Sequence, residues 1–220
     1  MLDFIELYSG IDLLIVMLAY VLAIVIALTC HEFSHAIVSY KMGDLTAKSQ
    51  GRVSLNPLHH IDPIGFVCLL LFGFGWAKPV PVNDLKFKNY RRGIFLTSIS
   101  GVVTNFILAF LFSGAFTLLY PKLIAHSSNY LVAFVYNFLI YSMSINLGLA
   151  IFNILPIPPL DGFNVITAFT RYDNKFINFM RRYSFIFFLV ILITPAFELL
   201  FSWLSGIIYP AFMSFWGFVF

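Results

Sequence analysis

The stretch LLIVMLAYVLAIVIALTC, from Leu13 to Cys30, contains no charged residue and runs without a break into HEFSH at His31 to His35. Its eighteen residues, rising about 1.5 Å each in a helix, are about enough to cross the hydrocarbon core of a bilayer. No glycine or proline follows before Gly43, and the first positive charge is Lys41. The sequence therefore predicts a transmembrane helix that carries the polar residues of HEFSH into or close to the membrane.

The composition supports a membrane location for the whole chain. Of its 220 residues, 60% are hydrophobic and only 10% are charged, whereas soluble domains have about 25% charged residues. The net charge of +3 and the lack of a basic tract argue against nucleic acid as a partner. The acidic residues Asp3 and Glu6 precede the first apolar run, which is too long for the core of a signal peptide, so we expect this helix to be retained. We expect a single integral-membrane domain over residues 1–220, with a catalytic core at about 12–170 and C-terminal helices at about 174–220.

Further apolar runs follow the first one. Three are long enough to cross a bilayer. They cover roughly Ile94 to Leu119, Tyr130 to Leu155, and Tyr183 to Leu204, the last interrupted by Pro195. Two shorter runs fit re-entrant or interfacial helices, namely Ile64 to Phe74 and Ile207 to Phe220.

The segment between the first two long runs has a different character. GRVSLNP at residues 51–57 and KPVPVND at residues 78–84 are short, partly alternating and contain proline, which is typical of edge strands. The predicted fold class is therefore an all-α polytopic membrane protein. It has about four to six transmembrane or re-entrant helices and a small membrane-associated β-strand region.

The positive charges predict an orientation. With four crossings, only Lys122 of the thirteen lysines and arginines falls on the side that also holds Asp3 and Glu6. The side rich in lysine and arginine is expected to be cytoplasmic. We therefore expect a multi-pass protein of the cell membrane whose active site opens toward the cytoplasm.

His31-Glu32-Phe33-Ser34-His35 is an HExxH pattern on this predicted helix. Histidines at i and i+4 share a helix face, so both imidazoles can reach a single zinc ion. Zinc activates water, and Glu32 beside the first histidine can act as the base that takes its proton. The alternative is two ordinary polar histidines near a helix end. Ionisable residues at membrane depth are costly and favour the functional interpretation.

A catalytic zinc site normally needs a third protein ligand. Asp161 follows three prolines in NILPIPPLDGFNVI, just after the third long run. Such a proline-broken segment is tolerated at membrane depth where it lines a cavity. An N-cap of the next helix is an equally good interpretation of Asp161 from the residues alone. The other candidates for the third ligand are Asp44, His59, His60, Asp62 and Glu198.

These motifs resemble the site-2 protease family of intramembrane zinc metalloproteases. HEFSHA at residues 31–36 resembles the first motif of the family, and LDG at residues 160–162 resembles the second, which implies that Asp161 is the third zinc ligand. GRVSLNPLHHIDPIG at residues 51–65 and GWAKPVPVN at residues 75–83 resemble the compact prokaryotic branch, which has no inserted PDZ domain.

The resemblance also implies roles for two asparagines and a substrate. Asn153 matches an asparagine near the scissile carbonyl, where its amide can stabilise an oxyanion. Asn105 matches the asparagine of a G-x-x-x-N motif, although Val102 stands where proline is common. An interhelical hydrogen bond is the alternative for both. The implied substrate is a transmembrane segment of a membrane protein, or its remnant, cleaved with one catalytic zinc ion.

An unwound substrate can pair with an exposed strand edge. This assigns substrate binding to Arg52, Val53, Ser54 and Leu55, unless these residues simply pair with residues 79–82. Two other classes fit the same histidines: a membrane metalloprotease with Glu198 as third ligand, and a non-catalytic zinc-binding scaffold or transporter.

Overall fold

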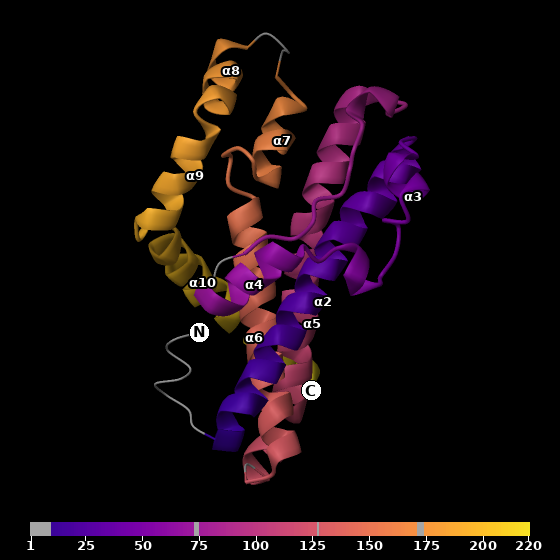
Figure 1. The fold of residues 1–220 in the computed structure, drawn as a ribbon. Coiled ribbons are helices and arrows are strands. Elements are labelled where there is room, and N and C mark those ends of the chain that lie inside the picture. The colour runs from indigo at the N-terminus through magenta and orange to yellow at the C-terminus, as the bar shows by residue number, and fades with distance from the viewer. Residues whose placement is uncertain (1–9, 73–74, 127, 171–173) are drawn as a thin grey trace.

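The computed structural model describes residues 10–72, 75–126, 128–170 and 174–220. Within them, four helices are long and apolar enough to cross a membrane. They are α2 (Gly10–Met42), α5 (Tyr90–Ala125), α6 (Tyr130–Asn153) and α10 (Ala196–Val219). Between them lie shorter helices: α3 (Thr46–Ser49), α4 (Pro63–Phe72), α7 (Asp161–Thr167), α8 (Lys175–Arg182), α9 (Ser184–Ile193) and the 3-10 turns Pro57–His59 and Asp84–Lys86. The predicted all-α membrane fold is confirmed (Figure 1).

Helices α2, α5 and α6 pack against one another and form the centre of the molecule. One face of α2 carries a residue at every fourth position with little or no exposed surface: Ala19, Ala23, Ala27, His31, His35 and Ser39. Small side chains allow helix backbones to approach closely in a membrane, where there is no hydrophobic drive between helices. The two histidines therefore continue the stripe on which the neighbouring helices pack.

The fourth crossing differs from its prediction. Thr194 is extended, as expected for a residue before proline, and α9 ends at Ile193. A new helix, α10, then starts at Ala196 and continues through Pro210 to Val219. The predicted interruption at Pro195 is confirmed, whereas the span over residues 183–204 and the separate tail over residues 207–220 were wrong, because α10 runs without a break from Ala196 to Val219.

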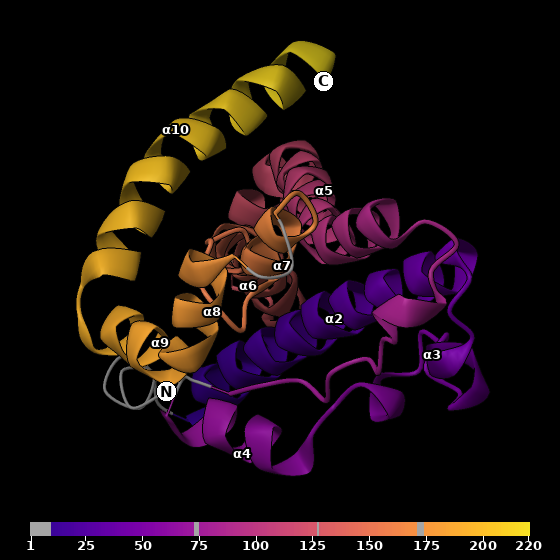
Figure 2. The same cartoon turned by 90° about the horizontal axis from the view of Figure 1, so that it is seen from above.

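Helix α10 sweeps around the outside of the bundle in the view of Figure 2 and packs against α5 and α6. The indole nitrogen of Trp216 donates a hydrogen bond to the carbonyl of Phe110 over 3.0 Å. Gly114 leaves room for that indole, since a Cβ there would lie 2.6 Å from its ring. Beside this contact, Leu147 of α6 and Phe212 of α10 share a buried apolar cluster.

The predicted strand region is not formed in the described residues. They contain a single antiparallel bridge, between Ile61 and Ala77. Residues 75–83, here called the strap, pair with the segment before α4 at this bridge, where the Lys78 N–H also donates to the His60 carbonyl over 2.8 Å. Other backbone groups of the strap bond to side chains: Arg52 donates to the carbonyls of Lys78 and Pro79, and the Val80 N–H donates to Glu32. These bonds take the groups that a neighbouring strand would use.

Helices α3, α7 and α8 and the start of α5 lie at one end of the bundle, whereas the α5–α6 connection lies at the other (Figure 1). The lysines and arginines that flank the starts of α3 and α5 therefore gather at one end, and Lys122 in the last turn of α5 lies opposite. The predicted separation of charge along the molecule agrees with this arrangement. Asp3, Glu6 and Arg171 lie outside the described residues.

Candidate metal centre

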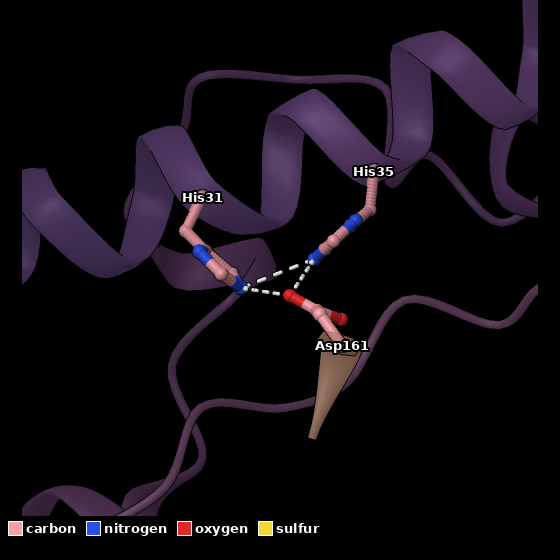
Figure 3. A group of neighbouring side chains, drawn as sticks. All are labelled: His31, His35 and Asp161. Carbon is pink, nitrogen blue, oxygen red and sulfur yellow. Dashed lines mark hydrogen bonds and ion pairs between the residues drawn. The ribbon is translucent and has the colours of Figure 1, made fainter. Parts of the chain in front are cut away.

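His31 and His35 lie one turn apart on α2, as the HExxH spacing predicts, and are 6% and 9% exposed. Their rings stand nearly perpendicular, with centroids 4.6 Å apart. Both Nε2 atoms point to the same side of the helix, where they meet the carboxylate of Asp161 (Figure 3). Two segments far apart in the sequence therefore meet at one buried point.

Asp161 is the first residue of α7 and comes from the proline-rich turn after α6. Its Oδ2 atom lies 3.3 Å from Nε2 of His31 and 3.2 Å from Nε2 of His35. Asp161 thus brings one carboxylate oxygen close to both ring nitrogens.

Hydrogen bonds to the other ring nitrogen show which histidine atoms face the carboxylate. Nδ1 of His35 lies 2.7 Å from the carbonyl oxygen of Thr97, and Nδ1 of His31 lies 2.6 Å from Oδ1 of Asn105. Both oxygens accept hydrogen bonds, so Nδ1 carries the proton in each ring. In a neutral ring, Nε2 then carries no proton and presents its lone pair.

The three inward atoms form a small triangle. The two Nε2 atoms are 3.0 Å apart, and each is slightly more than 3 Å from Oδ2 of Asp161. Ligands about 2.0–2.1 Å from a tetrahedral zinc ion are about 3.3–3.4 Å from one another. Oδ2 of Asp161 is buried and accepts no hydrogen bond of acceptable geometry. Three electron-rich atoms this close need a cation between them, and their spacing and chemistry fit zinc.

Gly101 of α5 closes the opposite side of this triangle. A Cβ at Gly101 would lie 2.5 Å from Cε1 of His31 and 2.6 Å from Nε2 of His35. The α5 backbone therefore rests directly on both rings, with no space for a side chain. In the sequence, this glycine is marked only as the first residue of the motif that ends at Asn105. Its contact with the rings depends on how α5 meets α2, which no local pattern reports.

A cavity of about 430 Å³ opens beside the histidines. Glu32 and Asn153 line it together with the three candidate ligands, and Pro79 and Val80 of the strap form part of its wall. Oε2 of Glu32 accepts the Val80 N–H over 3.0 Å. The amide of Asn153 donates to the Leu149 carbonyl of its own helix over 3.0 Å. The structure thus brings the predicted base and the predicted oxyanion donor to the same cavity.

The predicted substrate-binding residues, Arg52 to Leu55, do not line this cavity. Arg52 is buried, and its guanidinium donates hydrogen bonds to two carbonyls of the strap. Leu55 is exposed, and Val53 and Ser54 are partly exposed.

The remaining candidates for a third ligand lie elsewhere. Asp44 bonds to Thr46 and Asn83. His60 bonds to the Ser54 carbonyl, and Asp62 caps the start of α4 through the Gly65 N–H. Glu198 is exposed on α10, and His59 is exposed in its turn. Among the described residues, the group of His, Cys, Asp and Glu side chains close enough to hold one metal ion consists of His31, His35 and Asp161.

Comparison with known proteins agrees with this chemistry. The sequence model described as peptidase family M50 matches residues 114–194, a region that includes Asn153 and Asp161. "Putative zinc metalloprotease YwhC" of Bacillus subtilis is 42% identical over 179 residues, which cover 80% of each chain.

More distant relatives carry related names. "Putative zinc metalloprotease Rip2" of Mycobacterium tuberculosis is 26% identical over 191 residues, covering 84% of this chain and 69% of the relative. "Putative zinc metalloprotease MJ0611" of Methanocaldococcus jannaschii is 32% identical over 136 residues, covering 62% of each. No solved structure gives a significant match.

Proposed function

The chain belongs to peptidase family M50, the site-2 protease family of membrane zinc metalloproteases, and from that premise we propose that it is an intramembrane endopeptidase. It hydrolyses peptide bonds in transmembrane segments of membrane proteins or in their remnants. The observation that carries the proposal is the meeting of His31, His35 and Asp161 beside Glu32 on an apolar spanning helix.

His31, His35 and Asp161 are the residues that would hold the zinc ion. When bound there, zinc lowers the pKa of water and polarises a carbonyl oxygen. Glu32 accepts the proton from the attacking water and passes it to the leaving amine. Oε2 of Glu32 accepts the Val80 N–H, and the remaining acceptor sites of the carboxylate are available to the water.

Asn153 stabilises the oxyanion of the tetrahedral intermediate. Its amide is within the cavity wall but is bonded to its own helix at Leu149. Once released from the Leu149 carbonyl, the amide can donate to the negative charge that develops in the cavity. An oxygen of the bound substrate then replaces the Leu149 carbonyl as the hydrogen-bond acceptor of this amide.

The substrate unwinds before cleavage, since a helix hides its carbonyls in its own hydrogen bonds. The strap and the exposed residues next to Arg52 offer extended backbone to which an unwound segment adds by strand pairing. Arg52 contributes by holding the strap carbonyls, so its part in substrate binding is indirect. The substrate reaches the site from the bilayer, and water reaches it from the end of the bundle rich in lysine and arginine, which faces the cytoplasm.

The test compares the wild-type protein with Glu32→Gln in liposomes that contain transmembrane peptides, with products located by mass spectrometry. We expect wild type to cut within the apolar segment. Glu32→Gln keeps its zinc, because Glu32 is not a ligand, and loses cleavage by at least about 100-fold, the usual range for a general base.

Cleavage by Glu32→Gln at the wild-type rate would remove the proposed base. A zinc-binding scaffold or transporter would keep its function in this variant. A protease with Glu198 as a ligand would lose zinc on substitution of Glu198, which is exposed far along the chain on α10.

A further inference from the structure

Asn146 is a polar side chain with no exposed surface in the middle of α6, and nothing in the reaction above uses it. We propose that Asn146 is a positioning residue for the metal centre: it fixes the amide of Asn105, and through it the ring of His31. The proposal rests on the ligand set of the proposed function. It adds a residue from a third helix to the support of that set.

The observation is a chain of hydrogen bonds across α2, α5 and α6. Nδ1 of His31 meets Oδ1 of Asn105 at 2.6 Å. Nδ2 of Asn105 donates to Oδ1 of Asn146 over 2.8 Å. Nδ2 of Asn146 donates to the Ser142 carbonyl over 2.8 Å. Asn105 and Asn146 are each 0% exposed, so water does not compete with these bonds.

The last acceptor in this series of hydrogen bonds, the Ser142 carbonyl, sets the orientation of both amides. The Ser142 carbonyl only accepts hydrogen bonds, so Asn146 presents Nδ2 to it and turns Oδ1 toward Asn105. Asn105 must then present Nδ2 to Asn146. The second hydrogen of that Nδ2 faces the Ala27 carbonyl at 3.2 Å, which favours the same orientation. Oδ1 of Asn105 is left facing His31 as an acceptor.

This orientation of the Asn105 amide favours metal binding by His31. An acceptor at Nδ1 keeps the proton on that nitrogen and leaves the Nε2 lone pair free to bind a metal. A reversed Asn105 amide would offer a donor to Nδ1 and move the ring proton to Nε2, where it would block the metal. Asn146 opposes that reversal, because a reversed Asn105 would place two oxygens against each other.

The two histidines differ in how they are secured. His35 bonds to the backbone carbonyl of Thr97, which cannot reverse its polarity. His31 bonds to a side-chain amide, which can rotate by half a turn. A second fixed partner is therefore needed on the His31 side and not on the His35 side. Asn146 supplies it.

The test measures zinc affinity of the purified, detergent-solubilised protein by competition with a chelator, without reference to proteolysis. Asn146→Leu keeps the branched shape of the side chain and removes both hydrogen bonds. We expect zinc affinity to fall about 10-fold to 100-fold, the usual effect of losing a group that orients a metal ligand.

Asn137→Leu is the matched control. Asn137 lies on the same helix, is partly buried and bonds to the carbonyl four residues earlier over 2.8 Å, but does not reach the metal site. Its loss should leave zinc affinity unchanged. Equal affinities for wild type and Asn146→Leu, or equal losses for Asn146→Leu and Asn137→Leu, would overturn the proposal. Absence of zinc binding by wild type would instead overturn the ligand set itself.

A measurement on wild type keeps the proposal falsifiable if Asn146→Leu does not fold. Nitrogen-15 NMR of the zinc-loaded protein should show His31 protonated at Nδ1 and bound to metal through Nε2. The opposite assignment would contradict the chain of hydrogen bonds.

Discussion

Gly101 shows how little space the candidate metal centre leaves at the scale of a single residue. Its Cα lies against both histidine rings, and the nearest contacts of an added Cβ would be 2.5–2.8 Å. Real Cβ atoms do not approach other atoms so closely, and the contacting atoms belong to buried rings whose other nitrogens are already bonded. Any side chain here must displace α5 or the rings.

Gly101→Ala is therefore predicted to lower the affinity for zinc, although alanine is the better helix former. We expect at least a 10-fold loss of zinc affinity, the scale of effect seen when ligand orientation is disturbed. Gly148→Ala is the control, because a Cβ there would meet its nearest neighbour, Phe201, at 3.8 Å, an ordinary contact. Metal content of the two purified variants checks the prediction. Unaltered zinc in Gly101→Ala would show that the rings have room to move.

The sequence predicts some residues of the metal centre directly, others only through the family resemblance, and one not at all. The HExxH spacing alone places His31 and His35 on one face, because four residues are close to one turn. Asp161 could not be chosen over its rivals by spacing, since the site joins two helices remote in sequence, and the family resemblance was needed. Asn146 was missed because its value depends on the direction of a bond to Asn105, which no local pattern records.

At the scale of elements, Asp44 ties together the end of α2, the start of α3 and the strap. One carboxylate oxygen accepts from the backbone and hydroxyl of Thr46, and the other accepts the Asn83 N–H over 2.7 Å. Burial raises the pKa of Asp44, but these hydrogen bonds and the charge of Lys86 outweigh it and leave the pKa below the usual range. The ionised carboxylate is therefore what holds the three segments.

The lowered pKa of Asp44 gives stability a predictable pH dependence. A carboxyl whose pKa is lower in the folded state stabilises that state above its unfolded pKa of about 4, and the benefit disappears as pH falls through the folded value. An asparagine side chain cannot titrate, so the Asp44→Asn variant should be less stable at pH 7, by about 1.5–3 kcal/mol for a charge-assisted hydrogen bond. The stability of this variant should also change less below about pH 4.

Thermal unfolding in detergent across this pH range checks the prediction. Parallel curves for wild type and Asp44→Asn would mean that Asp44 does not contribute through its charge.

Two elements show where sequence patterns fell short. Residues 78–84 have strand-like alternation, but Pro79 and Pro81 lack N–H donors and the free backbone groups bond to Arg52 and Glu32. Periodicity cannot reveal such side-chain partners. Pro195 was expected to interrupt one helix, but the position of the spanning segment was misjudged, since α10 begins only at Ala196 and packs against α5 and α6.

At the scale of the whole molecule, the uneven distribution of positive charge predicts its orientation in the membrane. Lys88 is exposed just before α5 and Lys122 is exposed in the last turn of the same helix. In a variant without the two native cysteines, Lys122→Cys should react with a membrane-impermeant thiol reagent added to intact cells. Lys88→Cys should react only after the cells are opened. Labelling in the reverse order would place the metal centre at the outer surface.

The proposed metal centre joins a spanning helix to a distant turn through one zinc ion. The most direct measurement is the zinc content of wild type and Asp161→Ala, purified side by side from the same membranes. The geometry of His31, His35 and Asp161 predicts about one zinc per chain in wild type, as in other three-ligand catalytic sites, and a small fraction of that in the variant. Wild type without zinc, or Asp161→Ala with its full complement, would contradict the account.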